Sequence, residues 1–247
     1  MRENLCELLK NNPYPGRGIV LGMKSLPGAS AAVIAYWIMG RSANSRNRIF
    51  TKTEDGIRTE AQDPARLEDP SLIIYHPVRL LGSRTIVTNG DQTDTIREYL
   101  AQGKTFSDAL RTRTYEPDEP NCTPRISGLL ERNGRYTLSI LKASPGRTVR
   151  RQFFEYEAEG NLGHFISTYR GDGKPLPSFA GEPLEVSIDA PDAETMADRL
   201  WDALNEENKV SLFVRYIDLR NGFAQTVVKN KYGENWSETS KAPVWNT

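Results

Sequence analysis

Short apolar runs rich in β-branched and aromatic residues fill the first third of the chain and predict β-strands. Residues 17–23 and 31–40 form two such runs, and the Leu-Pro-Gly-Ala sequence between them is typical of a turn. Apolar and polar residues alternate over 48–61 around an Asp-Gly pair, a common hairpin turn, and 71–90 predicts two further strands. We therefore expect this part of the chain to be mainly β-sheet.

The period of the apolar residues changes to that of a helix after residue 90 and later changes back. In 93–103 the apolar residues have helical spacing and a glycine as a stop, and 105–113 begins with a Thr/Asp pair typical of a capping box. A third helix is predicted over 192–208, where Met196, Leu200 and Leu204 share one face. Strands are predicted over 136–143, 148–158, 163–170, 210–219 and 226–230.

Grouped strands and paired helices without regular strand–helix alternation favour antiparallel sheets that stack on each other and are flanked by helices. We therefore predict an α+β fold and not a parallel Rossmann sheet. A chain of 247 residues suits one such domain, which we expect to span 1–247. The Pro- and Gly-rich segment 171–183 is predicted to be a long loop within it.

Charge and cysteine content narrow the class of partner. The 32 basic residues balance the 32 acidic ones, so no net charge attracts nucleic acid or a membrane surface, and we expect a small-molecule partner. No apolar run reaches the roughly 20 residues needed to cross a bilayer, and we expect a cytoplasmic protein. Cys6 and Cys122 are far apart and lack metal-binding spacing, so we expect reduced thiols, no disulfide framework and no zinc site.

Several common catalytic and nucleotide-binding motifs do not occur in the sequence. It has no P-loop, no Rossmann glycine motif, no His-Glu-x-x-His zinc motif and no Gly-x-Ser-x-Gly nucleophile elbow. The two histidines, His76 and His164, lie in predicted strands, where a histidine is usually a packed or surface residue. We assign neither a metal role.

Three polar loops carry candidate chemistry. Residues 40–48 place three arginines among serines and asparagines, a donor set that suits a phosphate monoester but also a solvated turn. Residues 88–95 precede a predicted helix whose free N–H groups could hold an anion, although an Asn-Gly pair is commonly only a turn. Residues 115–125 contain three carboxylates and three prolines, which fits a stiff surface loop, a magnesium site or an acid/base site.

These segments, in this order, resemble the archaeal-type IMP cyclohydrolase family. The resemblance spans roughly two-thirds of the chain and runs through residues 16–22, 35–48, 75–82, 87–96, 115–126 and 163–171. It implies ring closure of 5-formamidoimidazole-4-carboxamide ribonucleotide (FAICAR) to IMP in purine biosynthesis, without a cofactor. It also implies a four-layer αββα sandwich similar to that of Ntn hydrolases.

The resemblance implies roles for individual residues. Tyr75 matches the family's active-site tyrosine, Glu119 its active-site glutamate and Arg48 its substrate-site arginine. Glu119 would then take the proton from the carboxamide nitrogen and Tyr75 would orient the formyl oxygen, while Arg48 and Arg41 would hold the 5′-phosphate. Further motif positions with expected substrate contacts are Asn89, Thr93, Asn121 and Arg125. The chain departs from the family pattern in an N-terminal extension over 1–15, in Cys122 and in the length of the 171–183 loop.

Two other functions remain open from the sequence. A true Ntn-type amide hydrolase needs a nucleophile freed as a new N-terminus, and only Cys6 is a candidate. The intact mass of active protein would reveal such processing. A non-catalytic purine-nucleotide-binding protein could keep the same pocket, and incubation with FAICAR would distinguish it from an enzyme. The oligomeric state, including a homo-oligomer, is also left open.

Overall fold

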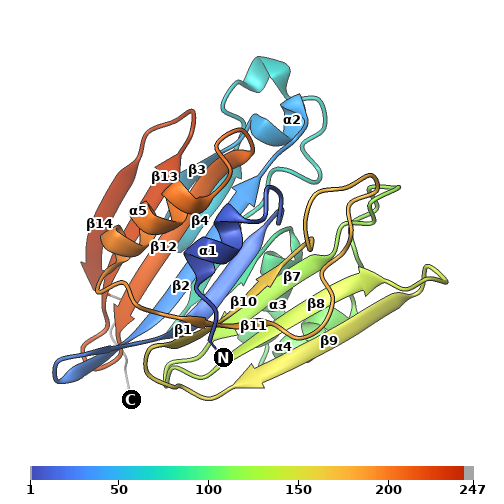
Figure 1. Cartoon of the computed structure of the whole chain (residues 1–247). Coiled ribbons are helices and arrows are strands. Elements are labelled where there is room, and N and C mark those ends of the chain that lie inside the picture. The colour runs from blue at the N-terminus through green and yellow to red at the C-terminus, as the bar shows by residue number, and fades with distance from the viewer. Residues whose placement is uncertain (1, 242–247) are drawn as a thin grey trace.

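Two antiparallel β-sheets form the centre of the protein in the computed structural model, which describes residues 2–241 (Figure 1). The first sheet has the order β11-β10-β1-β2-β12-β13-β14 and the second has the order β3-β4-β5-β6-β7-β8-β9. The strands of the first sheet are β1 (Gly18–Leu26), β2 (Ala29–Met39), β10 (Leu162–Ser167), β11 (Leu184–Ser187), β12 (Lys209–Asp218), β13 (Phe223–Asn230) and β14 (Trp236–Lys241). Those of the second are β3 (Ile49–Thr53), β4 (Gly56–Glu60), β5 (Val78–Leu81), β6 (Arg84–Thr88), β7 (Arg125–Leu130), β8 (Tyr136–Ala143) and β9 (Val149–Tyr156).

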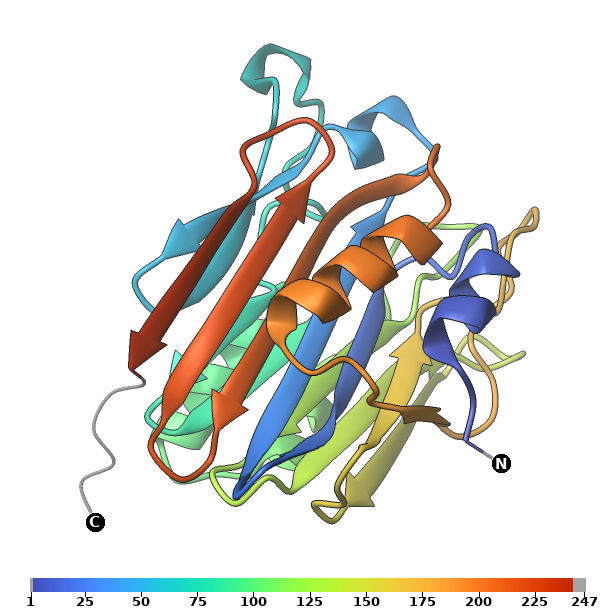
Figure 2. The same cartoon turned by 60° about the vertical axis from the view of Figure 1, so that its left-hand side comes forward.

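Helices cover the outer face of each sheet. Helices α1 (Leu5–Lys10) and α5 (Ala193–Ala203) lie on the first sheet, and α3 (Gln92–Ala101) and α4 (Phe106–Arg111) lie behind the second, as Figures 1 and 2 show. A one-turn helix α2 (Ala43–Arg46) and a short 3₁₀ turn (Pro64–Arg66) occur in the connections. The α+β class and the stacking of antiparallel sheets agree with the prediction from the sequence.

Alternating side chains along the strands divide the core into three apolar layers. Trp37 of β2 faces outward and packs with Leu200 of α5, while Ile34 of the same strand lies between the sheets with Ile126 of β7. Ile96 of α3 belongs to the third layer, beneath the second sheet. Because consecutive strand residues point to opposite faces, each sheet contributes to two of these layers.

Most predicted elements are present, and their ends follow local chemistry. The β1–β2 and β3–β4 hairpins form as expected, and the Thr105/Asp108 capping box begins α4. Helix α5 starts at the Asp192 N-cap but ends at Ala203, before the predicted residue 208, because a turn in which Asn205 accepts from the Asn208 amide follows it. The 171–183 segment is a loop, as predicted, and strands β7, β11 and β14 were not predicted.

The N-terminal extension contributes to the core. Leu5 and Leu9 of α1 are buried in the layer that contains α5, and Tyr14 joins the same layer. Residues 2–15 of the predicted extension therefore cover part of the first sheet and are not a loose arm. Within 2–241, no helix combines the length and the apolar character needed to span a membrane.

Candidate active site

Glu116 lies buried at one end of the sandwich, in the loop between α4 and β7. Its side chain is 2% exposed, and its Oε1 accepts a hydrogen bond from Asn89 Nδ2 at 3.2 Å. Burial raises the pKa of Glu116 to about 7, against the opposing effect of the Arg17 guanidinium. A carboxyl group with a pKa near neutrality can gain and lose a proton under physiological conditions, as a general base requires.

Two arginines, one largely and one fully buried, lie next to this carboxyl group. Arg17, which directly precedes β1, forms an ion pair with Glu116 at 3.9 Å between Nη2 and Oε2. Arg48 precedes β3, is fully buried and donates to the carbonyl oxygens of Ser45 at 2.8 Å and Met39 at 3.3 Å. Arg17 Nε and Arg48 Nη1 are buried without a hydrogen-bond partner among residues 2–241. Because a buried guanidinium N–H is costly without an acceptor, these two groups suit an anionic or carbonyl-bearing ligand.

Two tyrosine hydroxyls complete the cluster. Tyr36 on β2 faces the inter-sheet space, and its hydroxyl lies 2.8 Å from that of Tyr75. Tyr75 lies in the irregular segment before β5, where its amide donates to Thr59 Oγ1 at 2.8 Å and its carbonyl accepts from the Thr59 amide at 2.9 Å. These contacts to β4 fix the backbone of Tyr75. We name the group formed by Arg17, Tyr36, Arg48, Tyr75 and Glu116 the central cluster.

Aromatic rings border the central cluster. Tyr14 stacks on Tyr169 with ring centroids 6.0 Å apart, and the Arg41 guanidinium lies 5.0 Å from the Tyr14 ring centroid. Both tyrosines contribute to the raised pKa of Arg17, which indicates that they lie near this guanidinium. Flat aromatic surfaces next to cationic and acid/base groups suit a planar heterocyclic ligand.

Polar contacts behind Glu116 fix the loop that carries it. Asn89, directly after β6, also donates to the carbonyl of Pro124 at 2.9 Å and accepts from the amide of Ile126 at 2.8 Å. Gln92 donates to Asn89 at 3.1 Å and accepts from Arg125 Nη1 at 2.6 Å. Asn89 and Arg125 were both predicted as substrate-binding residues. In the structure, Asn89 bonds to Glu116 and to its loop, and Arg125 bonds to Gln92, which in turn bonds to Asn89.

The other predicted residues lie in different surroundings. Glu119 is on the surface, with its side chain 61% exposed and paired with Arg147, so the structure does not bring it to the central cluster. Thr93 is buried in the first turn of α3, where its hydroxyl donates a hydrogen bond to the carbonyl of Gly90 at 3.0 Å. Asn121 accepts from the Leu176 amide at 3.2 Å and so fixes the 171–183 loop. Arg41 is at the border of the cluster, where it pairs with Asp172.

Reasoning from the sequence missed Arg17, Tyr36 and Glu116. Arg17 lies in the Gly-Arg-Gly triplet at 16–18, and the alternation along β2 places Tyr36 on the same face as Ile34. Both signals were readable from the sequence. No local pattern distinguishes Glu116 from Glu119, because the loop has no periodicity and both residues precede a proline.

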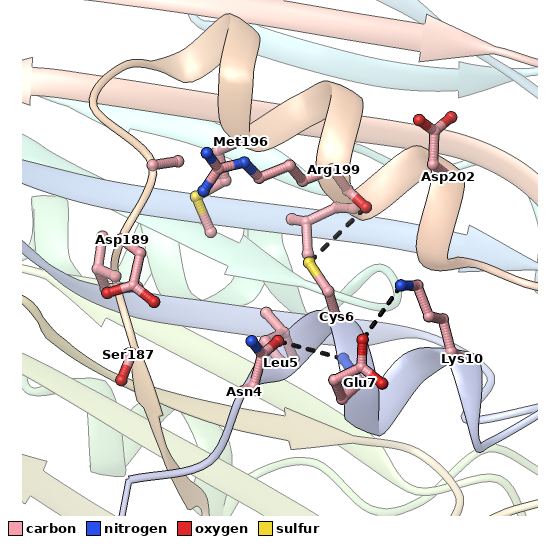
Figure 3. Close-up of a pocket in the computed structure, with 13 residues that line it drawn as sticks. Asn4, Leu5, Cys6, Glu7, Lys10, Ser187, Asp189, Met196, Arg199 and Asp202 are labelled. Atoms are coloured by element: carbon pink, nitrogen blue, oxygen red, sulfur yellow. Dashed lines mark hydrogen bonds and ion pairs between the residues drawn. The ribbon is translucent and has the colours of Figure 1, made fainter.

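The candidate cysteine nucleophile lies elsewhere. Cys6 is in α1, and its thiol donates to the carbonyl of Arg199 at 3.7 Å (Figure 3). It lines a pocket of about 340 Å³ between α1 and α5, on the outer face of the first sheet. Within the described residues 2–241, no three His, Cys, Asp or Glu side chains gather closely enough to hold a metal ion.

Comparison with known proteins identifies the family. The sequence model of the family described as IMP cyclohydrolase-like protein matches residues 14–222, a range that includes every residue of the central cluster. The chain belongs to the IMP cyclohydrolase-like family. The match leaves out α1 at one end and β13 and β14 at the other.

Relatives from three archaea show how much sequence identity this chain shares with other proteins of similar sequence. Each is named IMP cyclohydrolase. The Methanococcus aeolicus protein is 30% identical over 63% of this chain and 74% of its own length. The Methanocella arvoryzae protein is 26% identical over 78% of this chain and 88% of its own length. The Methanocaldococcus jannaschii protein is 27% identical over 83% of this chain and 94% of its own length.

The raised pKa of Glu116 predicts how the stability of this family member depends on pH. The folded protein holds this proton more tightly than the unfolded chain, so Glu116 stabilises the fold below its ordinary pKa of 4.5 and loses this contribution as the pH rises through about 7. Between pH 5 and pH 8 the free energy of unfolding should fall by about 2–3 kcal/mol more in the wild type than in Glu116→Gln. Urea denaturation at both pH values measures this difference, and parallel pH profiles would contradict it.

Proposed function

We propose that this protein is an IMP cyclohydrolase, which closes the purine ring by converting FAICAR to IMP with loss of water. The observation that carries the proposal is the central cluster, in which a carboxyl group with a pKa of about 7 lies beside two arginines and a pair of tyrosine hydroxyls. The family match over residues 14–222 and the names of the archaeal relatives support the same reaction. The reaction is that of a hydrolase acting on cyclic amidines, written in the direction of ring closure.

The chemistry asks for proton transfer and orientation. The carboxamide nitrogen of FAICAR bonds to the formyl carbon and loses one proton, while the formyl oxygen gains one and becomes the hydroxyl of a carbinolamine. That hydroxyl takes a second proton and leaves as water, and the former formamide nitrogen loses its proton as the C=N bond forms. Because both reacting groups belong to one molecule, the enzyme need only select the cyclising rotamer, move protons and stabilise charge on oxygen.

We assign the base to Glu116. Its burial, its pKa of about 7 and its hydrogen bond from Asn89 support the assignment. The family motif had suggested Glu119, but its side chain is 61% exposed, pairs with Arg147 and does not belong to the central cluster. Arg17, at 3.9 Å from Glu116, would stabilise the ionised base before it accepts the proton.

Tyr75 and Arg48 receive the remaining roles. Tyr75 donates to the formyl oxygen, and Tyr36, 2.8 Å from it, orients that hydroxyl. Arg48 holds the 5′-phosphate through its unpartnered Nη1, since a buried guanidinium stays charged at every working pH. Arg41, over the ring of Tyr14, would contribute from the border of the cluster.

The wider setting forms part of the same proposal. The helix, sheet, sheet and helix layers support an Ntn-hydrolase-like αββα sandwich. In this proposal the sandwich is a single domain over 1–247, and the reaction needs no cofactor. The enzyme would act in the cytoplasm on the purine nucleotide alone. A homo-oligomer is compatible with this scheme, because the central cluster is built from one chain.

The direct test is to incubate the purified protein with FAICAR and follow IMP by chromatography against a blank without protein. We expect IMP to form in proportion to enzyme concentration. A rate no higher than that of the blank would overturn the proposal. A tightly bound but unchanged nucleotide would instead identify a binding protein.

Tyr75→Phe should lower kcat by about tenfold to a hundredfold, at or below the low end of the range for a group that donates a proton in the transition state. The loss is partial because Tyr36 or water can still donate to the formyl oxygen. Steady-state kinetics with FAICAR measure the change. Tyr115→Phe is the matched control, since the Tyr115 hydroxyl bonds to the carbonyl of Arg147 at 2.8 Å and does not belong to the central cluster.

A further inference from the structure

A polar pocket lies between the two sheets near their β14 and β3 edges. Figure 2 shows both edge strands on the left. Its volume is about 500 Å³. The β3–β4 hairpin turn and the start of β5 form one wall, and the inward faces of β12, β13 and β14 form the other. No residue of the central cluster lines it, and the buried Phe213 is part of its lining.

Arg215 is the notable residue of this pocket. It lies on β12 between Phe213 and Ile217, which both face the inter-sheet core, so strand alternation directs its side chain inward. Arg215 is only 6% exposed, and its side chain makes no hydrogen bond or ion pair within residues 2–241. Its Nε is buried without a partner. Burial lowers the pKa of this arginine, and the nearest compensating charge, that of Glu238, already pairs with Lys52.

The groups around Arg215 have the character of an oxyanion site. Thr226, its partner on β13, has a buried hydroxyl without a hydrogen-bond partner, and so has Thr53 on the facing hairpin. Both threonines line the pocket. Basic side chains outnumber acidic ones in the lining, which contains Lys52, Arg79, Arg97, Arg215 and Lys241 against Glu54, Asp55 and Glu238.

Two of the three acidic residues in this lining, Asp55 and Glu238, are already paired with basic ones. Asp55 accepts from Arg79 at 2.7 Å and pairs with Arg97 at 3.2 Å. The Arg215 guanidinium therefore remains a buried cation of the pocket that forms no ion pair among residues 2–241. Keeping an unpaired guanidinium in a buried position costs several kcal/mol of effective solvation, which a ligand that bonds to it would offset.

We propose that this pocket is a second binding site, which takes the phosphate or diphosphate group of a small molecule and holds it with Arg215, Thr226 and Thr53. Guanidinium and hydroxyl donors match the oxygens of such a group in number and geometry. The site is independent of the reaction proposed above, because it shares no residue with the central cluster. A ligand bound here would bridge the edge strands of both sheets.

Inorganic pyrophosphate, titrated by calorimetry at low ionic strength, is the probe. Arg215→Met should weaken its binding at least about tenfold, as expected for the loss of a charge-assisted hydrogen bond. Arg111→Met is the matched control, since it removes an exposed guanidinium of α4 and should leave the affinity unchanged. Because Arg48 of the central cluster can also take a phosphate group, the titration is repeated in Arg48→Met, which should keep the binding that Arg215→Met weakens.

The same variant tests whether Arg215 is instead a structural residue. Without pyrophosphate, replacing an unpaired buried cation by an apolar side chain of similar length should raise Tm by roughly 2–4 °C. If Arg215→Met does not fold, Lys241→Met, an exposed change in the lining, should still weaken pyrophosphate binding. A lower Tm with unchanged affinity, or binding abolished by Arg48→Met and not by Arg215→Met, would overturn the proposal.

Discussion

Glu116→Gln is expected to lower kcat for ring closure by about 10²–10⁴-fold, with a small change in KM. Glutamine keeps the shape of the side chain and can still bond to Asn89, but it cannot accept the carboxamide proton. The effect should fall on kcat because the base acts in the transition state and not in ground-state binding. Steady-state kinetics with FAICAR give both constants.

Glu119→Gln is the matched control for this prediction. It makes the same chemical change three residues along the same loop, on a side chain that is 61% exposed. We expect activity within about twofold of the wild type, as for a surface substitution outside the site. An inactive Glu119→Gln beside an active Glu116→Gln would return the role of base to Glu119. Two active variants would remove both carboxylates from the mechanism.

Arg48→Met should raise KM by about 10- to 100-fold, as expected for the loss of a charge-assisted contact to the 5′-phosphate. The kcat should change far less, because a contact made equally in the ground and transition states affects mainly KM. Equal losses in kcat and kcat/KM would instead mean that Arg48 bonds to the reacting atoms. The kinetics should be measured at fixed ionic strength, since salt weakens phosphate pairing.

Arg46→Met controls for damage to the turn that carries Arg48. Arg46 also holds this turn by donating to a backbone carbonyl, that of Gly40, at 2.9 Å. It does not belong to the central cluster. A rise in KM confined to Arg48→Met would therefore report a lost ligand contact, whereas equal effects in both variants would report a displaced turn.

The local structure of much of this protein is determined by the sequence alone. Alternating apolar residues and turn signals predict the β1–β2 and β3–β4 hairpins, and the Thr105/Asp108 pair predicts the start of α4. These elements depend on interactions between residues close in the chain, which is why the pattern suffices. Strand β14 escaped prediction because it is a polar edge strand whose pairing partner, β13, supplies its hydrogen bonds.

The tertiary structure alone decides which polar residues meet. Glu116 and Glu119 are equivalent in the sequence, but Asn89 from the end of β6 and Arg17 from the start of β1 contact only Glu116. Alternation along β12 predicts that Arg215 points inward, yet only the position of the facing β3–β4 hairpin makes its surroundings a pocket. Local pattern fixes the direction of a side chain, whereas its burial, its partners and hence its pKa depend on residues distant in the chain.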